Sequence, residues 1–199
     1  MAKLIFNYSA MNSGKTMDLI RTAYNYSENN LKILIMKSSK DTKGNDTIVT
    51  RAGLSRKVDY LIKENDNIFE ILKNNIKDVK CIFIDEAQFL SEKQVIDLFI
   101  ICNTYDIPVI CYGLRTNFKG ELFEGSKTLL ALAEELNEFK TLCECGEIAR
   151  FNARKVNNEY VVDGESIVID GTKNIEYKPL CSKCFTKKVL IKKINKGSR

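Results

Sequence analysis

The sequence predicts an α/β fold: a mostly parallel sheet with helices on both faces, followed by a small cysteine-rich domain. Short runs that are apolar throughout alternate with segments of helical spacing, which is typical of parallel sheets buried on both faces. The first apolar run leads into a glycine-containing loop of the kind that binds phosphate. Two close pairs of cysteines lie near the end of the chain, where helical spacing stops.

The composition is that of an ordinary globular protein. Of the 199 residues, 44% are hydrophobic and 29% are charged, and no apolar run approaches the roughly 18 residues of a membrane span. Because no signal peptide is visible, we expect a cytoplasmic protein with no membrane partner. The net charge of +5 suits anionic nucleotides without requiring nucleic acid. Since the chain has no histidine, a general base has to be a carboxylate, Lys, Tyr or Cys.

The loop after the first apolar run resembles a phosphate site. Residues 4–8 read as a buried strand, and helical spacing begins at Met17. Between them lies a G-x-x-x-x-G-K-[ST] pattern with serine in place of its first glycine, made of Ser9, Ala10, Met11, Asn12, Ser13, Gly14, Lys15 and Thr16. We expect the loop N–H groups and Lys15 to bind ATP phosphates and the Thr16 hydroxyl to hold Mg²⁺. The alternative, an ordinary turn with a solvated Lys15, predicts no carboxylates downstream.

The middle of the chain continues the alternation. Residues 31–36 read as a second buried strand, and helical spacing over 66–76 precedes a third strand at 81–84. Residues 38–56 are polar with little periodicity, which suggests a mobile lid or a subunit contact.

Two further helices and one strand complete the predicted sheet domain. Ser91 with Gln94 has the form of a capping box and starts a helix that runs to about residue 104. A fourth strand covers 107–112 and ends at Gly113, and a last helix runs from Ser126 through Leu136.

Asp85 and Glu86 supply the carboxylates that a phosphate site needs. Right-handed crossovers bring the carboxyl ends of parallel strands to one edge, so this pair is expected beside the phosphate loop and the Gly113 loop. One carboxylate then serves Mg²⁺, directly or through water. The other has two interpretations: it orients a water in a nucleoside triphosphate hydrolase, or it takes a proton from a substrate hydroxyl in a kinase. A solvated acidic strand end is the remaining alternative.

The cysteines fall into two groups. Cys81, Cys102 and Cys111 lie in apolar runs and are interpreted as buried small side chains. A C-x-C pair and a C-x-x-C pair make up the second group: Cys143, Cys145, Cys181 and Cys184. These pairs predict a structural zinc site, whose complete ligand shell leaves no position for catalysis.

We place a domain boundary near residue 140, where helical periodicity gives way to short polar pieces and turn residues. The expected organisation is a phosphate-loop α/β domain over 1–140, a zinc-binding domain over 141–190 and a disordered basic tail over 191–199.

Together these residues resemble the zinc-containing, RecA-like thymidine kinases, especially a bacterial branch whose phosphate loop reads YSAMNxGK. The resemblance rests on residues 8–16, 85–90 and 112–123 and on the paired cysteines, and it covers nearly the whole chain. It implies transfer of the γ-phosphate of ATP to the 5′-hydroxyl of thymidine, and of deoxyuridine. It also implies a homotetramer that is inhibited by thymidine triphosphate, in which the zinc-based loop is a lasso over the nucleoside.

The resemblance further implies roles for individual residues. Glu86 is the general base for the 5′-hydroxyl, Asp85 and Thr16 attend the Mg²⁺, and Gln88 belongs to the ATP side. The nucleoside pocket comprises Phe89, Leu114, Phe118, Ile167, Val168, Ile169, Asp170 and Tyr177, with residues 166–170 reading the base through their backbone.

The chain departs from the family at two places. Lys43 stands where the family commonly has an arginine, shortly after the aspartate that matches Asp41. The turn between Asp170 and Tyr177 is longer than the family's Gly-Gly turn.

Two other classes of protein compete with this interpretation. A phosphate-loop ATPase with a zinc-ribbon nucleic-acid-binding module needs a basic stripe with interleaved aromatics, which the body of the chain lacks. A nucleotide-binding regulatory subunit has no use for a second carboxylate beside Asp85. The sequence therefore favours an enzyme that acts on ATP and thymidine, with Mg²⁺ and structural zinc and without nucleic acid.

Overall fold

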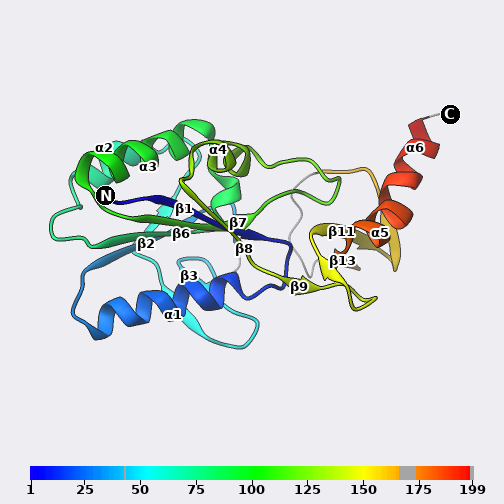
Figure 1. Ribbon diagram of the computed structural model, residues 1–199, viewed down its shortest axis with the longest axis horizontal. Coiled ribbons are helices and arrows are strands. Elements are labelled where there is room, and N and C mark those ends of the chain that lie inside the picture. Colours follow the sequence, from blue (N-terminus) through cyan, green and yellow to red (C-terminus); the bar gives the residue numbers. More distant parts are fainter. Residues whose placement is uncertain (43, 166–173, 198–199) are drawn as a thin grey trace. The chain divides into compact units, whose positions relative to one another are not determined.

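A six-stranded sheet forms the centre of the first of two units into which the chain divides (Figure 1). The computed structural model describes residues 1–42, 44–165 and 174–197. The first unit comprises Met1–Tyr8, Gly14–Gly113 and Glu124–Glu138, and the second comprises Ser9–Ser13, Leu114–Phe123 and Phe139–Arg199. The two units are thus interleaved along the sequence, and the division into separate domains at residue 140 stays a prediction.

The predicted parallel sheet is confirmed. Its strands in spatial order are β5 (Tyr60–Ile62), β2 (Ile33–Ser38), β6 (Cys81–Asp85), β7 (Val109–Leu114), β1 (Leu4–Ser9) and β8 (Glu135–Glu138). The pairs β2–β5, β2–β6, β6–β7 and β1–β8 run parallel. All five residues of β6 are buried, because the sheet is covered on both faces.

Helices cover both faces of this sheet (Figure 1). One face carries α1 (Lys15–Glu28), and the other carries α2 (Ile68–Lys73), α3 (Glu92–Tyr105) and α4 (Glu124–Leu132). The capping box predicted at the start of α3 is present, with Ser91 and Gln94 each bonding the other's backbone N–H. Cys81, Cys102 and Cys111 are fully buried in this unit, as predicted.

The last predicted helix is wrong at its end. Helical spacing over 126–136 predicts one helix, but α4 stops at Leu132 and Leu136 lies in β8. The cause is the free edge of β1: Glu134 N donates to Leu4 O, and Phe6 pairs with Leu136 in a parallel ladder. Tertiary pairing therefore overrides a local helical pattern.

Two other segments also differ from the predictions. β7 does not end at Gly113 but continues to Leu114. An antiparallel pair begins in the polar stretch 38–56 and ends one residue beyond it, β3 (Thr47–Val49) with β4 (Ser55–Lys57), and Ile48 of that pair is buried.

The second unit has its own sheet and core. Strands β12 (Glu159–Val161), β11 (Phe151–Val156) and β13 (Ile175–Leu180) form an antiparallel sheet, and β9 (Thr141–Leu142) pairs with β10 (Ile148–Ala149). A helical segment follows, made of α5 (Ser182–Phe185), the π-helical turn η2 (Thr186–Leu190) and α6 (Ile191–Gly197). Phe185 stacks on Phe151 at a ring separation of 4.7 Å. The basic tail thus carries a helix over 191–197, where the charge pattern predicts disorder.

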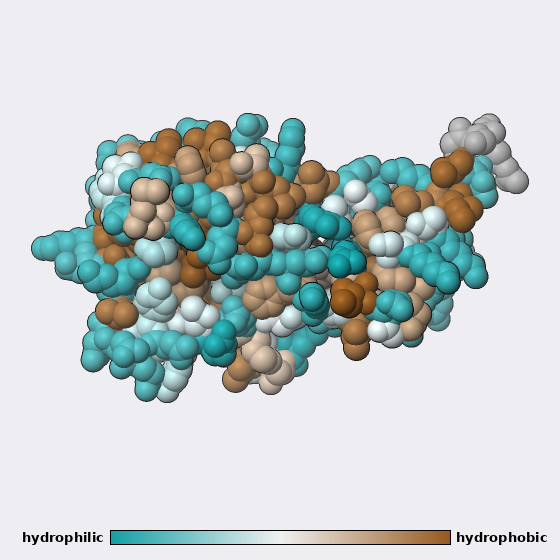
Figure 2. All heavy atoms as spheres, in the orientation of Figure 1, coloured by the Kyte–Doolittle hydropathy of each residue, from teal (hydrophilic) through white to brown (hydrophobic). Residues whose placement is uncertain are grey.

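Exposed apolar side chains gather on the face of the first unit that carries α3 and α4. Figure 2 shows hydrophobic atoms over the region where Figure 1 has α3 and α4. On α3, Ile96 and Ile100 are one turn apart and 38% and 42% exposed. Among the described residues, no helix is both long and apolar enough to cross a bilayer.

Candidate functional site

The end of β6 holds the two predicted carboxylates in a fixed geometry. Asp85 is the last residue of the strand and is 4% exposed. Glu86 follows with φ of +52°, a left-handed conformation that a non-glycine residue adopts at a cost and often at functional sites. This turn starts the short helix η1 (Ala87–Phe89), from which the buried Gln88 side chain donates a hydrogen bond to Glu86 Oε2. The left-handed backbone of Glu86 therefore sets the direction of its side chain, and the hydrogen bond from Gln88 holds its carboxylate in place.

Gly113 makes room for this arrangement. In the next strand, β7, a Cβ at this position would lie 2.8 Å from Gln88 Oε1 and 3.1 Å from Gln88 N. Only glycine lets β7 pass so close to the residue that holds Glu86.

Burial shifts the pKa values of the ionisable groups at this edge of the sheet. Burial, and then the charge of Glu86, raise the pKa of Asp85 to about 8. Burial and the nearby charge of Asp41 raise the pKa of Glu86. Burial lowers the pKa of Lys15 to about 8, although the carboxylates of Glu86 and Asp85 act in the opposite direction. A partly buried ammonium that interacts with two such carboxylates suits the binding of a phosphate, and a carboxylate of raised pKa suits the acceptance of a proton.

A second lysine reaches the same edge, and the sequence prediction missed it. Lys37 lies in β2 opposite Asp85 of β6 and is 1% exposed. Its ammonium forms an ion pair with Asp41, with 2.9 Å between Nζ and Oδ2. The available signal was a lysine inside an otherwise apolar strand, because a lysine is buried only when it is paired.

The first half of the phosphate loop, Ser9–Ser13, belongs to the second unit. Ser9 stands where the pattern has glycine, and its Oγ lies 2.5 Å from Ser13 Oγ and 2.6 Å from Ala10 O. Asn12 has φ of +64°. The serine thus closes the loop with its hydroxyl, which explains how the chain dispenses with the first glycine. The remaining loop residues, Gly14, Lys15 and Thr16, lie in the first unit, where Gly14 has φ of +85° and caps α1.

Several of the predicted nucleoside residues lie in the second unit. Phe118 is 1% exposed, and Tyr177 lies in β13 directly across from Arg154 of β11. Leu114 also belongs to this unit, whereas Phe89 lies in η1 of the first. The predicted base-reading residues Ile167, Val168, Ile169 and Asp170 lie outside the described residues, as does Lys43.

Arg154 is a further residue that the sequence prediction missed. Its guanidinium carbon lies 3.8 Å from the centroid of the Phe118 ring, and the residue is 4% exposed. Nη1 donates to Glu165 O at 2.7 Å and Nη2 donates to Asp163 O at 3.1 Å. A Cβ at Gly164 would lie 2.3 Å from Nη2, so the glycine lets the chain wrap around the guanidinium. Arg154 therefore joins Phe118 to the stretch that precedes residue 166.

The paired cysteines form a group that fits a metal ion. The Sγ atoms of Cys143, Cys145, Cys181 and Cys184 all lie within 4.8 Å of one another. A tetrahedral zinc with Zn–S bonds of about 2.3 Å requires S···S separations of about 3.8 Å, so the group suits zinc. Gly146, with φ of +88°, turns the chain after the first pair, and its N–H donates to Cys143 O.

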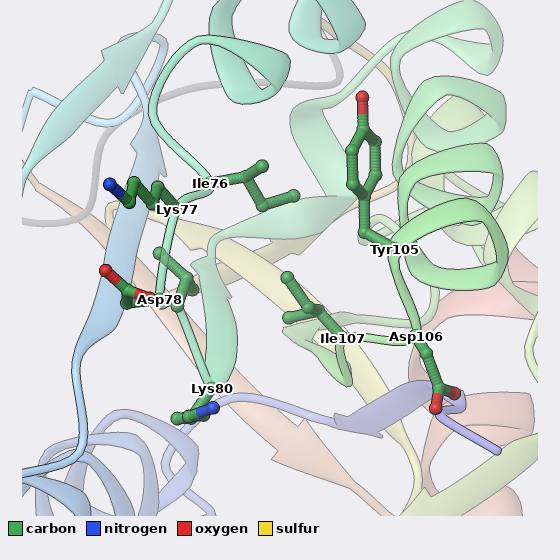
Figure 3. Close-up of a pocket in the computed structure, with 8 residues that line it drawn as sticks. Ile76, Lys77, Asp78, Lys80, Tyr105, Asp106 and Ile107 are labelled. Atoms are coloured by element: carbon green, nitrogen blue, oxygen red, sulfur yellow. The ribbon is translucent and has the colours of Figure 1, made fainter.

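A cavity of about 400 Å³ lies at the amino ends of β6 and β7, whereas the candidate site lies at their carboxyl ends (Figure 3). It is lined by the loops that precede β6 and β7, namely residues 76–80 and 105–107. It contains none of the predicted site residues, so it is separate from the candidate site.

Comparison with known proteins agrees with these features. The family model for thymidine kinase matches residues 2–185. The thymidine kinase of Mannheimia succiniciproducens is 44% identical over 192 residues, which is 94% of this chain and 97% of that protein. The thymidine kinase of Pasteurella multocida is 41% identical over 194 residues, 96% of this chain and 100% of that protein. The thymidine kinase of Enterobacteria phage T4 is 44% identical over 173 residues, 85% of this chain and 89% of that protein.

Among solved structures, a chain of Bacteroides Pif1 bound to ssDNA superposes with a TM-score of 0.39 at 10% identity, over 69% of this chain and 38% of that one. A likeness this distant carries no argument about function. The family model and the curated relatives, in contrast, match most of the chain. On that basis, the chain belongs to the thymidine kinase family.

Proposed function

We propose that the protein transfers the γ-phosphoryl group of ATP to the 5′-hydroxyl of thymidine, giving ADP and thymidine monophosphate, and that deoxyuridine is also accepted. The observation that carries this proposal is the pair Asp85 and Glu86, held beside Lys15 in a member of the thymidine kinase family. Of the two roles open to the second carboxylate, membership of a kinase family favours the one that deprotonates a hydroxyl.

Glu86 is the proposed catalytic base. It accepts the 5′-hydroxyl proton as the 5′-oxygen forms its bond to the γ-phosphorus and the bond to the β-phosphate oxygen of ATP breaks. The partly buried position of Glu86 supports this role, because burial raises the pKa of its carboxylate and so makes it a stronger base than a solvated one. Gln88 positions the carboxylate by its hydrogen bond to Oε2.

The ATP phosphates are assigned to the phosphate loop. The proposed contacts are the loop residues Ser9, Ala10, Met11, Asn12, Ser13, Gly14, Lys15 and Thr16. Lys15 neutralises the developing charge on the transferred group, and Asp85 with the Thr16 hydroxyl holds the Mg²⁺ that accompanies ATP. The partial burial of Lys15 supports its role, because an ammonium that is already partly desolvated loses less hydration on meeting a phosphate.

The nucleoside is assigned to Phe89, Leu114, Phe118 and Tyr177, with residues 167–170 reading the base through backbone groups. The burial of Phe118 against Arg154 supports a preformed aromatic wall. We further propose that 141–190 is a lasso domain closed by one zinc on Cys143, Cys145, Cys181 and Cys184, and that 1–140 is the ATP-binding domain. The zinc would stabilise the fold of the lasso and take no part in the chemical step.

We also propose a cytoplasmic homotetramer that is inhibited by thymidine triphosphate and binds neither nucleic acid nor membrane. The exposed Ile96 and Ile100 on α3 support a subunit contact, since neighbouring exposed apolar side chains often mark an interface. Sedimentation of the purified protein tests the tetramer, and thymidine triphosphate titrated into the kinase assay tests the inhibition.

The test of the proposed function is the conversion of thymidine by the wild-type protein and by Glu86→Gln. The wild type should form thymidine monophosphate and ADP in equal amounts. A positioned base contributes roughly 10²–10⁴-fold, so Glu86→Gln should lose that much turnover while ATP affinity changes little. The competing ATPase would instead release phosphate without a nucleoside and respond to added DNA.

A further inference from the structure

Asn152 occupies an unusual place in β11. Side chains alternate along this strand, so Phe151 and Ala153 join the apolar cluster of the second unit. Asn152 and Arg154 therefore lie on the opposite face of the β12–β11–β13 sheet. Asn152 is 3% exposed. A buried amide has to find partners for both its oxygen and its nitrogen, because leaving either one unpaired costs free energy.

The two partners of Asn152 come from segments that are far apart in the sequence. Its Oδ1 accepts a hydrogen bond from Met11 N at 2.8 Å, and its Nδ2 donates to Thr116 O at 3.1 Å. Only this orientation of the amide satisfies both groups, since an N–H cannot accept and a carbonyl cannot donate. All three residues belong to the same compact unit.

Both partners belong to segments with proposed roles in the reaction. Met11 lies in the phosphate loop, between the Ser9 hydroxyl contact and the left-handed Asn12. Thr116 lies two residues before Phe118, the proposed wall of the nucleoside pocket. The phosphate loop is also tied by Thr141, whose hydroxyl donates to Asn12 O, but that bond is exposed. The bond from Asn152 to Thr116 is buried and the bond from Met11 to Asn152 is partly buried, so water competes with them less than with the Thr141 bond.

We infer that Asn152 is a positioning residue for the kinase reaction. Its side chain sets the first half of the phosphate loop and the start of the Phe118 segment in one fixed relation. It does so without touching the reacting atoms, through one backbone N–H and one backbone carbonyl. The role in catalysis rests on the proposed function, whereas the hydrogen bonds to Met11 and Thr116 do not depend on it.

The experiment compares the wild type with Asn152→Leu, which has a similar volume and no hydrogen-bonding groups. Asn74→Leu is the matched control, because within the described part of the chain the Asn74 side chain donates only to Glu70 O, at an exposed helix end. Hydrogen exchange at single amides is measured first, together with zinc content. In Asn152→Leu the Met11 amide should exchange at least about tenfold faster, as expected for the loss of a buried hydrogen bond. The acceleration should be confined to residues 10–12 and 116–118, with the β11–β13 ladder still protected.

The kinetic arm then measures kcat and KM for ATP and for thymidine. Asn152→Leu should lower kcat/KM for both substrates by about tenfold or more, and Asn74→Leu should stay within about twofold of the wild type. An unchanged Met11 exchange rate would overturn the inference, as would acceleration spread evenly over the β11–β13 ladder, which indicates a merely structural role. Unchanged kinetics in the presence of faster Met11 exchange would also overturn it.

Failure of the proposed function gives a different result. In that case the wild type itself forms no thymidine monophosphate. The exchange measurement, with ATP affinity determined by calorimetry on both variants, then decides the inference. An ATP affinity of Asn152→Leu equal to that of the wild type would reject a role for Asn152 in positioning the phosphate loop, and at least about tenfold weaker binding would support it.

Discussion

Lys37 Nζ lies 2.9 Å from Asp41 Oδ2, and the lysine side chain is only 1% exposed. Lys37 stands opposite Asp85 in the β2–β6 ladder. The ion pair therefore ties Asp41 to the end of the sheet that carries Asp85 and Glu86. Buried pairs of this kind add little compared with an apolar pair, but breaking one leaves a charge without its partner.

Lys37→Met should therefore destabilise the protein by about 3 kcal/mol. This value is the lower end of the range for breaking a buried ion pair, because Asp41 keeps partial contact with water. The measurement is unfolding of Lys37→Met, Asp41→Asn and the double variant. The two changes should be coupled by more than about 1 kcal/mol. Lys40→Met is the control, because the Lys40–Glu64 pair is exposed and should contribute less than about 1 kcal/mol. Fully additive effects of the Lys37 and Asp41 changes would contradict the account.

Asp85 should make the ligand-free protein less stable as the pH rises. Its pKa is raised from 3.8 to about 8, so the folded state holds a proton that the unfolded state has already lost. The stabilisation from this proton is full below pH 3.8 and disappears as the pH rises through about 8. Asp85→Asn carries no such charge, so its advantage in melting temperature over the wild type should grow between pH 5 and pH 8, roughly the interval between the two pKa values. A difference that does not vary with pH would show that Asp85 is ionised in the folded protein.

The sequence predicted the parts of this site that follow a local pattern. The phosphate loop, the carboxylate pair at the end of β6 and the paired cysteines each have a characteristic spacing, and so does the capping box at Ser91. Asn152 and Arg154 have none, because their partners Met11, Thr116 and Phe118 lie far away in the sequence. Lys37 pairs with the nearby Asp41 and has only the weak signal of a lysine within an apolar strand. Likewise, residues 135–138 form β8 because the edge of β1 is open, and no local signal reveals that edge.

Arg154→Met should affect the nucleoside more than ATP. The change removes two hydrogen bonds to the carbonyls of Asp163 and Glu165 and the contact with the Phe118 ring. A hydrogen bond to a charged group is worth roughly 1.5–3 kcal/mol, so KM for thymidine should rise by at least about tenfold. KM for ATP should stay within about threefold, since none of these three contacts involves a residue of the phosphate loop. Equal effects on both substrates would reject the assignment.

The control for Arg154→Met is Lys155→Met in the same strand. Lys155 Nζ lies 4.9 Å from the centroid of the Tyr160 ring, and Tyr160 is not one of the proposed pocket residues. Its replacement removes a comparable cation–aromatic contact from the other side of β11, and both KM values should stay near those of the wild type.

The proposed zinc should be required for the nucleoside side of the protein. Freshly purified protein should contain one zinc per chain, and Cys181→Ser should lose most of it because a Cys₄ shell needs all of its ligands. Thymidine binding should weaken more than ATP binding, since the cysteines close the base of the lasso. Cys102→Ala, at a buried cysteine of the other unit, should keep its zinc. Less than half a zinc per chain in the wild type would count strongly against the site.

The most direct test of the thymidine kinase assignment is kcat/KM for thymidine, deoxyuridine, deoxycytidine and deoxyguanosine under one condition. The thymine methyl group is worth about 0.8 kcal/mol when buried, so thymidine should exceed deoxyuridine by only several-fold. Cytosine exchanges a donor and an acceptor on its pairing edge, and a mismatch with buried backbone groups can cost roughly 10⁴-fold. Deoxyguanosine should fail on size. The account predicts deoxycytidine and deoxyguanosine at least about 10³-fold below thymidine, and deoxycytidine within about tenfold of thymidine would contradict it.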